Sequence, residues 1–74
     1  MISMWIKHQN GECIAKYDRF EVNSMGGILG YQGPEDFEGA MIGVYKEKDR
    51  AKEVLMDIYN DIHLGQSISF VPKE

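Results

Sequence analysis

The chain has 74 residues, a formal net charge of −4 and one cysteine, Cys13. This length predicts a single domain, residues 1–74, with a thin hydrophobic core, and one cysteine excludes a disulfide within the chain. Eight basic residues against 12 acidic ones do not form the clustered positive charge that direct nucleic-acid binding requires.

The sequence also argues against a membrane protein. No apolar segment approaches the about 20 residues that cross a bilayer. The first ten residues lack the long apolar stretch of a secretory signal peptide. A lone cysteine is typical of a reducing compartment. We therefore expect a cytoplasmic protein.

The first 45 residues are predicted to form short strands separated by turns. Strands are expected at 2–7 and 12–16, and Asn10-Gly11 between them favours a type I′ turn, in which both residues have positive φ angles. Further strands are expected at 19–23, 28–32 and 40–45. The polar segment 33–39, with the sequence GPEDFEG, is predicted to be a loop.

Residues 46–63 carry the clearest pattern in the chain. Their apolar residues recur every three or four positions, which predicts one amphipathic helix, at Ala51, Val54, Leu55, Ile58, Tyr59 and Ile62. The start of this helix lacks a good N-cap residue, whereas Gly65 suits the left-handed position after its end. Residues 67–71 are predicted to be a short final strand or tail.

These elements predict an α+β fold: a small antiparallel sheet of four to five strands, with one C-terminal amphipathic helix on one face. Replacing Leu55 by Ala should cost about 2–5 kcal/mol. The expected core combines the inward positions of strands and helix: Ile6, Ile14, Phe20, Val22, Ile42, Val44, Ala51, Val54, Leu55, Ile58 and Ile62.

The sequence contains no specific catalytic, metal or nucleotide motif. The glycines at 26–30 lack the Lys-Ser/Thr pair of a phosphate-binding loop. His8, His63 and Cys13 do not have zinc-ligand spacing, and Cys13 is expected to be a small core residue. We therefore expect that the protein is not an enzyme and uses neither a cofactor nor a metal.

A small domain without a disulfide or a metal often gains stability from a partner subunit. An open sheet edge or an uncovered sheet face would favour a two-fold homodimer. Trp and Tyr dominate many interfaces, and Met adapts to them. The interface is expected to contain Met4, Trp5, Tyr31 and Met41.

Five segments of the chain carry a common pattern: Trp5-Ile6-Lys7, Gly30-Tyr31, the Gly-x-Tyr-Lys at 43–46, Arg50-Ala51-x-x-Val54-Leu55-x-x-Ile58, and the Ser-Phe-Val-Pro at 69–72. Together they resemble a family of very short proteins from phages and mobile elements of Gram-positive bacteria. Its members open with a Met-Trp-Ile-Arg-Ser-Gln-like strand and close with a hydrophobic tail ending in Met-Pro. This chain has His8-Gln9 in place of the Ser-Gln pair and Glu47 in place of a Ser N-cap. The resemblance implies a mobile-element accessory protein.

Small size, acidity and surplus aromatic residues favour a non-catalytic inhibitor of a host protein, such as a defence nuclease. Carboxylates can occupy a basic groove where phosphates would otherwise lie. The alternative is an oligomeric sponge for a signalling nucleotide, for which Arg19, Lys7 and Arg50 are the available cations. The expected binding residues of the inhibitor are Glu35, Asp36, Glu38, Glu12 and Glu21.

Overall fold

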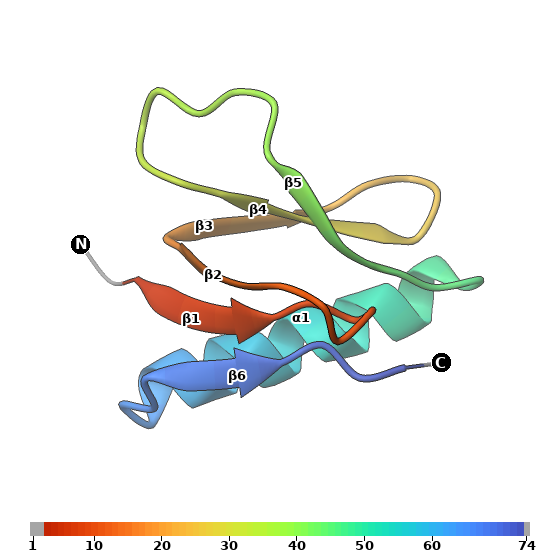
Figure 1. The fold of residues 1–74 in the computed structure, drawn as a ribbon. Helices are drawn as coiled ribbons and strands as arrows, with labels where there is room; N and C mark the ends of the chain where they lie inside the picture. Colours follow the sequence, from red (N-terminus) through yellow and green to blue (C-terminus); the bar gives the residue numbers. More distant parts are fainter. Residues whose placement is uncertain (1–2, 74) are drawn as a thin grey trace.

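A computed structural model describes residues 3–73, which form six strands and one helix (Figure 1). The helix runs behind the strands in this view. The predicted α+β class is confirmed. The elements are β1 (Met4–Lys7), β2 (Ile14–Tyr17), β3 (Arg19–Val22), β4 (Gly27–Tyr31), β5 (Ala40–Val44), α1 (Lys48–His63) and β6 (Ile68–Phe70).

The strands form two three-stranded sheets instead of the single sheet expected. In the first sheet, β1 pairs with β2 antiparallel and with β6 parallel. In the second sheet, β4 pairs with β3 and β5, both antiparallel. Only Asp18 separates β2 from β3. The chain therefore changes sheets at this bend, and its last strand returns to the first sheet.

The core lies between α1 and the inward faces of the strands. Helix residues Ala51, Val54 and Ile58 are buried, as expected. Leu55 is only half-buried. The largest fully buried side chains are Tyr45, Met4, Ile6, Ile28, Ile42, Ile58, Val54 and Ser69.

The core prediction is wrong for two residues, Ile14 and Val44, which are exposed. Ile14 is 56% exposed because β2 directs Ala15 and Tyr17 inward, so Ile14 falls on the opposite face. Val44 is 52% exposed. The pairing of β4 with β5 shifts register between Ile28 and Leu29, and such an irregularity changes which residues face inward.

The two ends of α1 follow the sequence prediction. Glu47 occupies the N-cap in an extended conformation, and its side chain makes no capping hydrogen bond. Gly65 has a φ of 78°, and its N–H donates to the Ile62 carbonyl at 3.0 Å. The helix thus ends at a left-handed glycine.

The hairpin between β1 and β2 differs from the predicted type I′ turn. Gly11 has a φ of 74°, but within residues 3–73 only glycines have positive φ, so Asn10 does not. The N–H of Gly11 donates to the His8 carbonyl at 2.9 Å. The Asn10 side chain accepts from the N–H of Glu12 at 2.9 Å. A longer loop allows this turn, with left-handed backbone only at the glycine.

Candidate binding site

The segment 33–39, here called the acidic loop, is closed by the carboxylate of Asp36. This carboxylate accepts the N–H of Gln32 at 2.9 Å and the N–H of Gly39 at 3.0 Å. These main-chain donors lower the pKa of Asp36, because they stabilise its charged form. Asp36, predicted as a binding residue, therefore holds the loop in shape from within.

The acidic loop is also fixed to the bend between the two sheets. The Asp18 carboxylate accepts the N–H of Gly33 at 3.1 and 3.2 Å. The Arg19 guanidinium donates to the Asp36 carbonyl at 2.9 Å and lies 4.3 Å from the centroid of the Tyr31 ring. Two neighbouring residues of the bend thus hold both ends of the Gly33–Asp36 turn.

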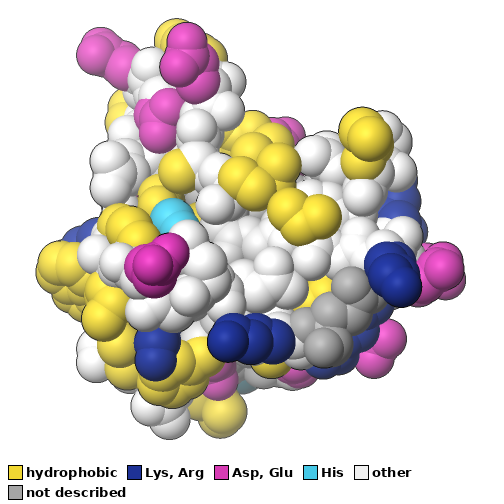
Figure 2. All heavy atoms as spheres, turned by 45° about the vertical axis from the view of Figure 1, so that its right-hand side comes forward, with side chains coloured by type: hydrophobic (Ala, Val, Ile, Leu, Met, Phe, Trp, Pro, Cys, Tyr) yellow, Lys and Arg dark blue, Asp and Glu magenta, His cyan; other side chains and the backbone are white. Residues whose placement is uncertain are grey.

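The tip of the acidic loop presents Phe37, which is 82% exposed, between the exposed Glu35 and Glu38. Figure 2 shows acidic side chains projecting from the body of the molecule at the top, where this loop lies in Figure 1. The sequence predicts the acids as binding residues, whereas Phe37 is not among the predicted residues. The sequence feature that could identify Phe37 is its position: it is an aromatic residue that belongs to no apolar repeat and lies in a polar loop bounded by glycines.

The other two predicted carboxylates lie outside the loop. Glu21, on β3, accepts a hydrogen bond from the Tyr31 hydroxyl, and this bond, followed by burial, raises the pKa of Tyr31. Glu12 is exposed in the β1–β2 hairpin of the first sheet. Only Glu35, Asp36 and Glu38 therefore belong to one local site.

The predicted interface residues fall into two groups. Met4 and Tyr31 are 1% and 6% exposed in the core of their own chain, so they are not available to a partner. Trp5 and Met41 are 45% and 48% exposed, but they lie on different sheets. Of the four, only Trp5 and Met41 can contact a partner without unfolding.

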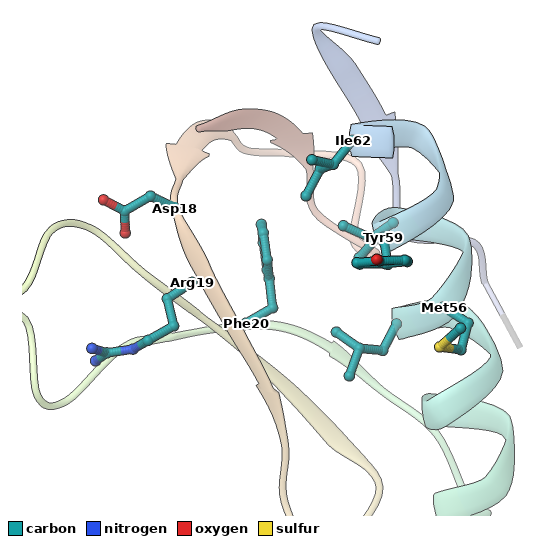
Figure 3. A pocket seen from close by; sticks show the side chains of 8 residues that line it. Asp18, Arg19, Phe20, Met56, Tyr59 and Ile62 are labelled. Carbon is teal, nitrogen blue, oxygen red and sulfur yellow. The ribbon is translucent and has the colours of Figure 1, made fainter. Parts of the chain in front are cut away.

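An open apolar groove of about 280 Å³ runs between β3 and α1. Figure 3 shows the Phe20 ring extending from β3 toward the helix, with Tyr59 and Ile62 on the opposite side. Leu55 also lines the groove, which explains why it is only half-buried. The lining carries Asp18 and Arg19, which already bond to the acidic loop.

The three cations considered for a nucleotide pocket lie apart. Arg19 is on β3, Lys7 on β1 and Arg50 on α1. Arg50 lies 3.9 Å from the Glu53 carboxylate, and the Lys7 ammonium is 5.9 Å from the centroid of the Phe70 ring. Of four surface cavities formed by the described residues, none is lined by two of these cations.

Cys13 is exposed, not buried as predicted, because β2 begins only at Ile14. His8 directly follows β1, and its Nε2 lies 2.8 Å from the hydroxyl of Tyr17 on β2. Burial lowers the pKa of His8. Within residues 3–73, no group of three or more His, Cys, Asp or Glu side chains could hold a metal ion. In the same range, no helix combines the length and apolar character that a bilayer crossing requires.

No protein family, curated protein or solved structure matches this chain significantly.

Proposed function

We propose that this protein is a non-catalytic inhibitor that inserts its acidic loop into a basic groove of a partner protein. The exposure of Phe37 at the tip of a loop fixed from within carries the proposal. An exposed aromatic residue is a typical anchor of a protein interface. A loop already held in its bound shape loses less conformational entropy on binding.

The chemistry of the loop defines the partner. Phe37 requires an apolar pocket, and Glu35 and Glu38 on either side require Lys or Arg at the rim of that pocket. A groove that binds nucleic acid offers both, because bases stack on apolar side chains and phosphates pair with cations. The phage resemblance points to a host defence protein, such as a nuclease, as the owner of this groove.

Capture from a Gram-positive host lysate on the immobilised protein tests this function. We expect one or a few proteins to be retained and to be released by heparin, a polyanion that competes for basic grooves. Glu35→Gln/Glu38→Gln and Phe37→Ser should each reduce capture about 10-fold or more, as is typical of interface anchors. Any captured nuclease should lose activity when the parent protein is added in solution.

A matched variant, Glu53→Gln/Asp57→Asn, removes the same charge from exposed helix positions and should capture as the parent does. Equal capture by all variants would contradict the proposed site. Stabilisation by a signalling nucleotide in a thermal-shift screen, with no protein captured, would instead favour the nucleotide sponge.

A further inference from the structure

The outward side of the first sheet is both apolar and basic. Its six exposed positions, here called the outer face, are Trp5, Lys7, Ile14, Lys16, Ile68 and Phe70. In the register of the strands, Trp5 lies between Lys16 and Ile68, and Lys7 lies between Ile14 and Phe70. Four large apolar side chains thus share one small surface with two lysines.

The two lysines of the outer face lie close to its aromatic rings. The Lys16 ammonium is 5.8 Å from the centroid of the Trp5 ring, and the Lys7 ammonium is 5.9 Å from that of Phe70. No position of the outer face carries a carboxylate, although the chain as a whole has a net charge of −4. The outer face is therefore locally positive on an acidic protein, and a partner should be acidic and partly apolar.

The acidic loop of the same chain has this chemistry. It offers one exposed aromatic ring, Phe37, with Glu35 and Glu38 beside it and no basic residue. One chain cannot bring the two surfaces together, because Asp36, Asp18 and Arg19 fix the loop. In Figure 1 the loop rises beyond β3 and β4, on the side away from β1 and β6.

We propose that a second copy of this chain covers the outer face with its acidic loop. Phe37 of one copy packs against Trp5 and Phe70 of the other, while Glu35 and Glu38 pair with Lys7 and Lys16. When each copy gives its loop and receives the other's, the contact is isologous and closes as a two-fold dimer. Both exposed apolar surfaces are then removed from water.

This pairing extends the proposed function, and in that respect rests on it, because it occupies the loop that the inhibitor would use. The dimer would be a resting form, and a partner with a better basic groove would displace the second copy. Variants of the outer face should therefore abolish pairing but leave the loop free to bind the partner. Variants of the loop should abolish both.

Light scattering across a concentration series measures pairing without any partner. We expect the mass of the parent to rise from one chain, 8.5 kDa, to twice that value, with a midpoint that moves to higher concentration in high salt. Lys7→Glu/Lys16→Glu and Glu35→Lys/Glu38→Lys should each weaken pairing about 10-fold or more, since like charges then meet across the contact.

The decisive experiment is charge exchange. Mixing Lys7→Glu/Lys16→Glu with Glu35→Lys/Glu38→Lys restores one of the two attractive contacts, so we expect mixed pairs. Combining all four substitutions in one chain restores both contacts, so we expect homodimers of that chain. Lys48→Glu/Lys52→Glu, on the exposed surface of α1, is the matched control and should pair as the parent does. Circular dichroism verifies that each variant is folded.

Two results would overturn the proposal: the parent remains a single chain throughout the series, or the chain that carries all four substitutions fails to pair. If the monomeric parent also binds a single-stranded oligonucleotide, and Lys7→Glu/Lys16→Glu loses that binding, the outer face is assigned instead to base stacking and phosphate contacts.

Discussion

The side chain of Gln9 bonds to both main-chain groups of Val44. Its Nε2 donates to the Val44 carbonyl at 3.0 Å, and its Oε1 accepts the Val44 N–H at 2.9 Å. The main-chain N–H of Gln9 also donates to the Ile42 carbonyl at 2.9 Å. The hairpin of the first sheet therefore takes the place of a strand along the edge of β5 and joins the two sheets. A covered edge of this kind is protected from pairing with other chains.

Gln9→Ala should lower the free energy of unfolding by about 1–2 kcal/mol, because it leaves both main-chain groups of Val44 without this partner. Gln9→Glu provides the sharper test. A carboxylate cannot donate to the Val44 carbonyl, whereas a protonated carboxyl can. The deficit of Gln9→Glu relative to the parent should therefore shrink as the pH falls. Urea unfolding at neutral and acidic pH measures both effects, and an unchanged midpoint for Gln9→Ala would show that the link is not stabilising.

Alanine substitutions at Gly26 and Gly11 should distinguish the cost of backbone strain from the cost of a steric clash. Both have positive φ, 82° and 74°. A Cβ atom on Gly26 would lie 2.2 Å from the Tyr45 carbonyl oxygen, whereas nothing lies within 4 Å of one on Gly11. Gly11→Ala should therefore cost about 1–2 kcal/mol, from strain alone. Gly26→Ala should cost clearly more, because main chain would have to move. Thermal unfolding of the two variants gives the comparison, and equal losses would argue against the close approach at Gly26.

Much of the fold could be predicted because periodicity reports which residues face inward. The helix, its left-handed glycine and the approximate positions of all six strands follow from such patterns. Pairing does not, because alternation does not say which strand lies beside which. The parallel contact of Trp5 with Ile68 joins opposite ends of the chain, and no local signal marks it. Met4 lies in the core and not at the predicted interface for the same reason: the face that each strand turns inward depends on its partners.

The candidate site was only partly predictable. Glu35 and Glu38 are exposed as their polarity suggests, but the internal role of Asp36 depends on main-chain groups that only the folded loop brings within reach. Phe37 is not predicted, because an isolated aromatic residue in a polar segment belongs to no repeat. Trp5 is predicted as an interface residue because it is a surplus aromatic residue. Its neighbours on the outer face could not be identified without the register of β6.

Ile58 and Leu55 should differ in their response to truncation. Ile58 is 1% exposed in the core, whereas Leu55 is half-buried along the open groove between β3 and α1. Ile58→Ala should cost about 2–5 kcal/mol. Leu55→Ala should cost roughly half as much, and therefore less than the sequence alone predicts for a core position, since solvent already reaches one side of the Leu55 side chain. Denaturant unfolding of both variants decides the order. A larger loss for Leu55→Ala would mean that the groove is closed in solution.

Asp36→Asn should loosen the acidic loop and leave the core intact. Asparagine offers one acceptor oxygen, so it cannot serve the N–H groups of Gln32 and Gly39 in the way that two carboxylate oxygens do. Amide hydrogen exchange at these two positions should therefore become faster in the variant, while exchange in α1 stays unchanged. Because the pKa of Asp36 is lowered in the folded state, the parent loop should keep its protection until the pH falls below the usual range of an Asp carboxyl. Unchanged exchange at Gln32 and Gly39 in Asp36→Asn would contradict this role.

His8 should make the stability of the whole domain depend on pH. Burial lowers the pKa of His8 below its usual value of 6.5, so the unfolded chain takes up the proton before the folded chain does. The folded state therefore keeps its full stability with respect to His8 above pH 6.5. It loses stability progressively as the pH falls from 6.5 toward the pKa of His8 in the folded state. His8→Gln cannot titrate in this window, so its melting temperature should fall less than that of the parent on acidification. His63→Gln, which removes the other histidine and keeps His8, is the matched control. Melting curves between pH 8 and pH 5 test this, and identical slopes for the parent and His8→Gln would show that burial of His8 does not control the response.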